Sequence, residues 1–244
     1  MQLSYFGKPF HGWQVQPNAV SVQEKLNQSA STILAREIYC VGAGRTDTGV
    51  HAREMWAHFD CDSELPADFQ HRLNSLLGPD IAVHKIKPVT TDAHSRFDAL
   101  SRTYEYHFIF KKDPFLKDYA WLVYPQPDLE KMRKAASSLF SFTDFSSFSR
   151  SKTQTKTNNC KIQAVDWQEK DQKLIFTIKA DRFLRNMVRA IVGTLVEVGQ
   201  GKKAIDDFAA IIAAKDRRRA GESAPAHGLY LTQVEYPKEI FNGR

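Results

Sequence analysis

The strongest constraint on the fold is a ten-residue segment, residues 101–110, in which aromatic residues occupy alternate positions. An extended chain places alternate side chains on opposite faces, so this period of two predicts a β-strand. We expect the aromatic face of this strand to lie largely in a hydrophobic core. The aromatic positions are Tyr104, Tyr106, Phe108 and Phe110.

Helices and strands alternate along the rest of the chain. Ser21 and Glu24 form the capping-box pattern that opens a helix, and apolar residues at helical spacing follow as far as Leu34. Further helices are predicted at residues 66–77, 128–140, 183–198 and 204–214. Further strands are predicted at residues 3–6, 38–41, 55–59, 81–89, 161–167, 173–180 and 229–236, with a polar loop at 146–159. This order indicates an α+β fold in two halves, 1–100 and 101–244.

The two halves differ in charge. Residues 1–100 contain 9 Lys and Arg against 11 Asp and Glu, a net charge of −2, whereas residues 101–244 contain 25 against 17, a net charge of +8. A basic half suggests a polyanionic partner, and nucleic acid is the commonest polyanion.

Composition narrows the class of protein. With 42% hydrophobic and 25% charged residues the chain resembles a soluble globular protein. It has no apolar run of about 18 residues, so we expect no membrane span, and its first residues lack a secretion signal. The cysteines, Cys40, Cys61 and Cys160, form no C-x-x-C pair and have no zinc-site spacing. We therefore expect reduced thiols in a cytoplasmic protein without a metal site.

A glycine-rich segment, residues 42–52, is the part of the chain that says most about chemistry. It reads Gly-Ala-Gly-Arg-Thr-Asp-Thr-Gly-Val-His-Ala, and its three glycines permit positive φ and a close approach of backbone to ligand. A dinucleotide-binding G-x-G-x-x-G pattern fails, because Asp47 stands where the third glycine belongs. A P-loop also fails, because no Gly-Lys-Ser/Thr follows.

Arg45 and Asp47 are two residues apart and share a side of an extended chain. The guanidinium would favour the ionised carboxylate, which at the exit of a strand suits a nucleophile or a general base. The alternative from local chemistry alone is a turn in which Asp47 caps its own backbone.

Seven segments, spread over nearly the whole chain, match one protein family in the family's order. They are residues 11–16 (HGWQVQ), 21–24 (SVQE), 44–52 (GRTDTGVHA), 93–99 (AHSRFDA), 102–106 (RTYEY), 183–189 (FLRNMVR) and 224–229 (APAHGL). Of these, 44–52 is the most specific. On these motifs the chain resembles the TruA family, tRNA pseudouridine synthase A.

The resemblance implies a pseudouridine synthase fold, with two α/β halves whose antiparallel sheets join around a basic central cleft. It implies isomerisation of uridine to pseudouridine at positions 38, 39 or 40 of the tRNA anticodon stem-loop. It also implies a homodimer in which one tRNA contacts both subunits, with no metal and no organic cofactor.

The resemblance also implies roles for individual residues. Asp47 is the catalytic carboxylate, which could attack C1′, add to C6 or remove a sugar proton; the sequence leaves these routes open. Arg45 is expected to hold the flipped-out nucleotide or to fill its space in the RNA stack. Tyr104 is expected to stack on the extruded uracil. Arg189 lies in an apolar helix, where a charge needs a partner, and is the candidate for an ion pair with Asp47.

Basic residues in the second half are candidates for contacts with RNA phosphates, although each could equally be a solvated surface charge. They are Lys111, Lys112, Arg150, Lys152, Lys156, Arg217, Arg218 and Arg219. The densest run is Arg217–Arg219. In the N-terminal motif, a packing role is expected for Trp13.

Three other classes of protein are less consistent with the sequence. A tRNA-binding relative that has lost catalysis is disfavoured by the intact Arg45, Asp47, Tyr104 and Arg189. An RRM-like module would carry a Lys/Arg-Gly-Phe/Tyr run, which the sequence lacks. An NAD-dependent enzyme is disfavoured by the broken glycine pattern.

Overall fold

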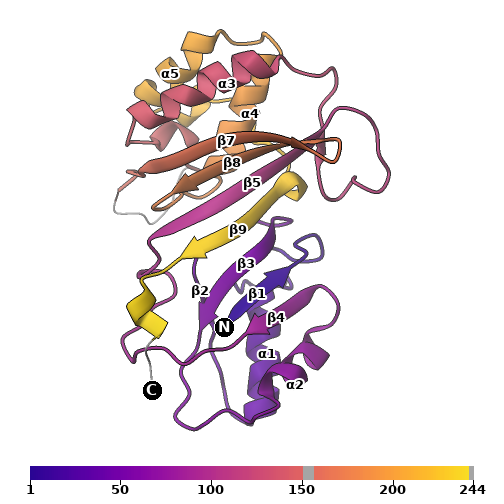
Figure 1. Ribbon diagram of the computed structural model, residues 1–244, viewed down its shortest axis with the longest axis vertical. Helices are drawn as coiled ribbons and strands as arrows, with labels where there is room; N and C mark the ends of the chain where they lie inside the picture. The colour runs from indigo at the N-terminus through magenta and orange to yellow at the C-terminus, as the bar shows by residue number, and fades with distance from the viewer. Residues whose placement is uncertain (151–156, 242–244) are drawn as a thin grey trace. The chain divides into compact units, whose positions relative to one another are not determined.

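The computed structural model describes residues 1–150 and 157–241, which form two compact units. Unit 1 contains Met1–Leu100 and the chain from Tyr230 onward, and unit 2 contains Ser101–Leu229. Each unit combines a largely antiparallel sheet with helices (Figure 1), which confirms the predicted α+β class. The last strand of the chain therefore belongs mainly with unit 1, although it follows unit 2 in sequence.

The sheet of unit 1 has the strand order β4-β1-β3-β9, and β2 pairs with β3. Its strands are β1 (Gln2–Tyr5), β2 (Val41–Gly42), β3 (His51–His58), β4 (Ile81–Lys85) and β9 (Leu229–Glu235). The pairs β1–β3, β1–β4 and β2–β3 are antiparallel, whereas β3 and β9 are parallel. The helices are α1 (Val22–Leu34) and α2 (Phe69–Leu77), followed at the C-terminal end by the 3₁₀ helix η5 (Lys238–Phe241).

Side chains near α1 decide how this part of the chain folds. The Glu24 amide donates to Ser21 Oγ (3.2 Å) and the Ser21 amide donates to the Glu24 carboxylate (3.4 Å), so the predicted capping box is confirmed.

The strand predicted at 38–41 is shorter than expected and reduces to β2. The Ile38 amide donates to Ser31 Oγ and the Cys40 amide to Asn27 Oδ1, so helix side chains take the donors that a longer strand would use.

The sheet of unit 2 has the strand order β5-β8-β7, with all neighbours antiparallel, and β6 runs parallel to β5. Its strands are β5 (Ser101–Ile109), β6 (Trp121–Leu122), β7 (Ile162–Lys170) and β8 (Lys173–Ala180). Helices α3 (Leu129–Ser137), α4 (Met187–Gly199) and α5 (Ile205–Ala214) gather on one side of this sheet (Figure 1). The 3₁₀ helices are η1 (Ser138–Ser141), η2 (Ser146–Phe148), η3 (Arg217–Arg219) and η4 (Ala226–Gly228).

The predicted hairpin of β7 and β8 is confirmed. Asp171 and Gln172 link the two strands and both have positive φ, 50° and 62°, as a two-residue turn with the twist of the flanking strands requires. The predicted loop 146–159 instead begins with η2, where Ser147 and Phe148 are buried.

Strand β5 carries the core of unit 2. Tyr106 and Phe108 are fully buried, as predicted. The prediction is wrong for Phe110, which lies just beyond the last strand residue, Ile109, and is only half-buried. The opposite face is also buried here, since His107 is 2% exposed and its Nε2 lies 2.8 Å from Glu105 Oε2.

Helix α4 is the most apolar helix, but it begins four residues later than predicted, at Met187. Asn186 adopts a left-handed φ of 65°, and a right-handed helix cannot run through such a residue.

Over residues 1–150 and 157–241, every helix is too short or too polar to cross a membrane.

The three cysteines are free thiols of unequal accessibility, which provides a test of the two cores. Cys40 and Cys160 are buried, and desolvation raises the pKa of each thiol to about 12, whereas Cys61 is partly exposed. Because the thiolate is the reactive species, iodoacetamide at pH 8 should alkylate Cys61 and leave Cys40 and Cys160 unmodified, as read by peptide mass spectrometry. Guanidinium-unfolded protein, the control, should be modified at all three; rapid labelling of either buried thiol in native protein would contradict the fold.

Candidate active site

Asp47 lies in unit 1, in the loop that connects β2 to β3, and its side chain is half-buried. The Val50 amide donates to the Asp47 carbonyl oxygen (3.1 Å), which closes a tight turn directly after the carboxylate. Gly49 occupies the turn with a φ of 79°, a conformation that favours glycine. The short turn thus limits the freedom of the Asp47 backbone.

The N-terminal segment holds this loop on both sides of Asp47. The Trp13 amide donates to the Thr46 carbonyl (3.2 Å), and the Gly49 amide donates to the Phe10 carbonyl (3.3 Å). The hydroxyl groups of Tyr5 and Thr46 are hydrogen-bonded at 2.8 Å in the interior. The first strand and the loop after it therefore form the scaffold on which the Asp47 loop rests.

Glycines make this close approach of backbones possible. At Gly12, which has a φ of 84°, a Cβ atom would lie 2.4 Å from the Thr46 carbonyl oxygen. At Gly42 a Cβ atom would lie 2.4 Å from the indole of Trp13, which is itself 1% exposed. The predicted packing role of Trp13 is thus confirmed. Gly44 differs, because a Cβ atom there would meet nothing within 4 Å.

Arg45 is exposed, and its Nε donates to Gln14 Oε1 at 3.1 Å. Gln14 is a site residue that the sequence reasoning did not single out, although it follows Trp13 directly in the N-terminal motif. A side-chain amide that accepts this hydrogen bond restricts the orientation of the Arg45 guanidinium.

His51 is the other group at the loop that could act as a base, and its surroundings assign it to structure. Its ring is 2% exposed and stacks between Phe6 and Tyr230, with centroid distances of 4.9 and 4.7 Å. Its Nδ1 accepts a hydrogen bond from the Gly7 amide at 2.9 Å. The His51 ring is thus enclosed by packing, whereas the Asp47 side chain is only half-buried.

Tyr104 lies in unit 2, on β5 opposite Ile178 of β8. Its ring contacts Phe183 edge-to-face, with centroids 5.1 Å apart and an interplanar angle of 86°. Unlike Tyr106 and Phe108 on the same strand, Tyr104 is only partly buried.

Arg189 lies in the first turn of α4 and is held by the segment 221–225. Its Nε donates to the Ala224 carbonyl (2.7 Å), while the Ala224 amide donates to the Arg189 carbonyl (2.9 Å). Gly193, one helical turn later, allows this segment to run against the helix, since a Cβ there would lie 1.8 Å from the Glu222 carbonyl oxygen. Backbone groups thus fix the guanidinium of Arg189 within unit 2.

The segment 221–225 is anchored by other side chains as well. Ser223 Oγ accepts hydrogen bonds from Asn186 Nδ2 (2.6 Å) and from the Arg217 guanidinium (3.1 Å). The Tyr106 hydroxyl donates to the Pro225 carbonyl at 2.7 Å. The motifs that contain Asn186 and Pro225 therefore meet in space as supports for one arginine.

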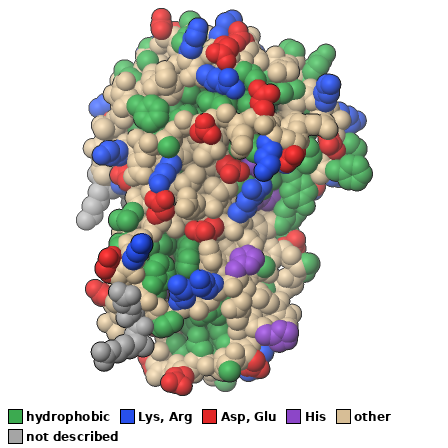
Figure 2. Space-filling view, viewed as in Figure 1, with side chains coloured by type: hydrophobic (Ala, Val, Ile, Leu, Met, Phe, Trp, Pro, Cys, Tyr) green, Lys and Arg blue, Asp and Glu red, His purple; other side chains and the backbone are tan. Residues whose placement is uncertain are grey.

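The basic residues predicted to contact RNA have different environments. Arg217 also donates to the Gly221 carbonyl at 3.1 Å, and Arg218 pairs with Asp216 at 2.8 Å, which lowers the pKa of that carboxyl to about 2. Others are exposed: Lys111, Lys112, Arg150 and Arg219. Lys152 and Lys156 lie outside the described residues. On the face of unit 2 seen in Figure 2, basic and acidic side chains are interspersed.

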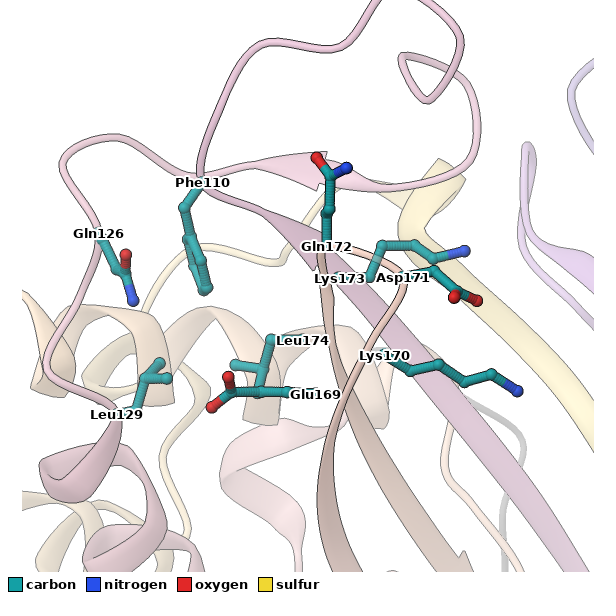
Figure 3. Close-up of a pocket in the computed structure, with 9 residues that line it drawn as sticks. All are labelled: Phe110, Gln126, Leu129, Glu169, Lys170, Asp171, Gln172, Lys173 and Leu174. Atoms are coloured by element: carbon teal, nitrogen blue, oxygen red, sulfur yellow. The ribbon is translucent and has the colours of Figure 1, made fainter.

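A separate cavity of about 390 Å³ lies in unit 2 between the β7–β8 turn and the start of α3 (Figure 3). It is lined by Phe110, Gln126, Leu129, Glu169, Lys170, Asp171, Gln172, Lys173 and Leu174. None of the predicted catalytic or substrate-binding residues lines it.

Among the described residues, no cluster of three or more His, Cys, Asp or Glu side chains is arranged to hold a metal ion.

Comparison with known proteins defines the class. A family model described as tRNA pseudouridine synthase matches residues 135–237. The chain is 51% identical over 243 residues to tRNA pseudouridine synthase A of Bacteroides fragilis. The alignment covers 98% of this chain and 96% of the relative. It is 39% identical over 240 residues to the enzyme of the same name from Geobacter sp. strain M21, with 97% of each chain covered.

A third relative, tRNA pseudouridine synthase A of Porphyromonas gingivalis, is 51% identical over 244 residues, covering 98% of this chain and 97% of that one. These similarities extend over both units. The chain therefore belongs to the tRNA pseudouridine synthase A family, a family of isomerases, as the sequence motifs predicted.

Two glycine substitutions test how the Asp47 loop is held. Gly12→Ala places a Cβ against the Thr46 carbonyl at a residue with positive φ, and should lower the free energy of unfolding by roughly 2 kcal/mol or more. Gly44→Ala, the matched control, meets open space and should change it by less than about 0.5 kcal/mol. Urea denaturation measures both, and equal stabilities of the two variants would contradict the proposed packing.

Proposed function

We propose that the protein isomerises uridine to pseudouridine in tRNA, at positions 38, 39 or 40 of the anticodon stem-loop. Membership of the tRNA pseudouridine synthase A family supports the reaction and the substrate. The observation that carries the proposal for this chain is the anchored loop that presents Asp47. A carboxylate on a loop with restrained backbone is the kind of preorganised group that catalysis requires.

The reaction balances with the atoms of the substrate alone. The N1–C1′ bond breaks, a C5–C1′ bond forms, C5 loses a proton and N1 gains one, so the step needs no oxidant or reductant. Asp47 would attack C1′, add to C6 or remove a sugar proton, and all three routes need the same fixed carboxylate. Glycoside hydrolysis normally uses two carboxylates, whereas one suffices here because the base departs and then returns.

Three further residues are proposed to bind the target nucleotide. Arg45, oriented by Gln14, holds the flipped-out nucleotide or fills its space in the RNA stack. Tyr104, which is only partly buried, is proposed to stack on the uracil. Arg189, fixed by the Ala224 carbonyl, is proposed as a third binding residue. Its ion pair with Asp47 stays a prediction.

Affinity for tRNA is proposed to come mainly from phosphate contacts. The candidates include the exposed basic residues Lys111, Lys112, Arg150 and Arg219 of unit 2. Arg218 would have to exchange Asp216 for a phosphate, and Arg217 would have to leave its own loop. We also propose a homodimer that binds one tRNA with both subunits and acts in the cytoplasm.

Asp47→Ala tests the catalytic assignment. Tritium release from tRNA transcripts containing 5-tritiated uridine should fall by at least about a thousandfold, because the reacting carboxylate is lost. Binding of tRNA should stay within about threefold of wild type, since phosphate contacts are untouched. Asp92→Ala, which removes an exposed carboxylate of unit 1, is the control and should keep full activity. Near-wild-type release by Asp47→Ala would refute the role of Asp47.

Salt dependence tests the phosphate contacts. Each phosphate neutralised by Lys or Arg releases counterions, so raising the salt from 50 to 200 mM should weaken tRNA binding by at least about tenfold. Filter binding with Asp47→Ala avoids turnover during the measurement. The substitution Arg219→Ala should reduce the slope of log K against log salt by about one phosphate contact. An affinity that does not change with salt would remove the basic surface from the proposal.

A further inference from the structure

Phe97 is the most exposed large hydrophobic residue of unit 1 among the described residues, with 73% of its surface exposed. It lies in the motif 93–99, to which the proposed function assigns no role. The exposed guanidinium of Arg96 lies 5.7 Å from the centroid of its ring, and the His94 ring lies 4.2 Å from it on a tilted plane. An aromatic ring and an arginine are thus presented together to solvent.

The turn that carries Phe97 is internally ordered. His94 Nδ1 accepts hydrogen bonds from the Arg96 amide (3.1 Å) and the Phe97 amide (3.3 Å). The Asp98 carboxylate accepts from the His94 amide (2.6 Å), and the Asp98 amide donates to the His94 carbonyl (3.1 Å). Phe97 is therefore exposed on a turn in which the backbone amides of His94, Arg96, Phe97 and Asp98 bond within the turn itself.

Ser95 fastens this turn to the strands next to the Asp47 loop. Its side chain is 7% exposed, its Oγ donates to the Val41 carbonyl (2.7 Å), and its amide donates to His58 Nδ1 (3.1 Å). Val41 and His58 face each other in the β2–β3 ladder, and β2 leads directly into the loop of Asp47. The Tyr236 hydroxyl also donates to the Ser95 carbonyl, which holds the turn from the C-terminal segment.

We propose that the turn of residues 93–99 is a contact site for RNA, in which an unpaired base stacks on Phe97 and Arg96 lies beside that base or an adjacent phosphate. The inference rests on the proposed action on tRNA and adds a binding surface to it. Single-stranded RNA is recognised by bases that stack on aromatic rings and on guanidinium planes, and one ring is enough for one base.

The size of the exposed surface favours a base over a protein partner. A single phenylalanine offers at most on the order of 200 Å² of contact, whereas a stable protein interface buries at least about 1,000 Å². Rigidity points the same way, because a fixed platform loses little conformational entropy when a base stacks on it.

Four variants test this site by filter binding to an unmodified tRNA transcript. Phe97→Ala should raise the Kd about tenfold, because base stacking on an aromatic ring is lost. Phe97→Trp restores a ring and should stay within about twofold of wild type. Arg96→Ala should weaken binding by a smaller factor, roughly threefold. Phe140→Ala, the matched control, removes a phenylalanine of unit 2 that is 54% exposed and should leave the Kd unchanged.

The outcomes separate this inference from the proposed function. A wild-type protein that neither binds nor modifies tRNA would refute both. A wild-type protein that does both, with a Phe97→Ala variant of equal Kd and unchanged melting temperature, would overturn the stacking site alone. Loss of binding in Phe97→Trp equal to that in Phe97→Ala would also overturn it. So would a mass by light scattering that changes in Phe97→Ala while tRNA binding does not, because Phe97 would then contact protein.

Discussion

The contact between the N-terminal segment and the Asp47 loop is the constraint on which unit 1 depends. Two backbones approach so closely at Gly12 that a side chain would collide with the Thr46 carbonyl, and the Trp13 amide donates to that same carbonyl. Hydrogen bonds between backbone groups have little freedom of direction, so they fix the loop more firmly than long side chains could. Gly12, although far from Asp47 in the sequence, thus helps to fix the loop that carries Asp47.

Unit 2 applies the same principle to an arginine. Gly193 lets the segment 221–225 lie against α4, and the Ala224 carbonyl then receives the Arg189 side chain. A guanidinium has five donors in a rigid fork, so one fixed acceptor restrains the direction of the others. In each unit a glycine allows two backbone segments to approach closely. In unit 1 Gly12 lies against the loop of Asp47, and in unit 2 Gly193 lies against the segment whose carbonyl binds Arg189.

The sequence predicted best those features that depend on neighbours in the chain. The strand predicted from residues 101–110, the Ser21 capping box and the β7–β8 hairpin rest on local patterns, and all three are present, although the strand ends at Ile109. Features that depend on distant contacts were missed. The strand predicted at 38–41 is short because its backbone amides donate to side chains of α1. Gln14 accepts a hydrogen bond from Arg45 only because the fold brings these two distant residues together. Helix α4 begins later than predicted, because Asn186 before it adopts a left-handed φ and its side chain donates to Ser223, 37 residues away.

The difference in charge between the two units bears on the proposed recognition of tRNA. The net charge of −2 over residues 1–100 and of +8 over residues 101–229 assigns most phosphate attraction to unit 2, since the last 15 residues carry two charges of each sign. Phosphate contacts hold any RNA and carry no information about sequence. Selection of one uridine would therefore have to come from groups that contact bases, and Tyr104 and Phe97 are the aromatic residues proposed for that task. On the proposed function, an acidic unit 1 is compatible with tRNA binding, because Asp47 and Phe97 would act on individual nucleotides and not on the whole polyanion.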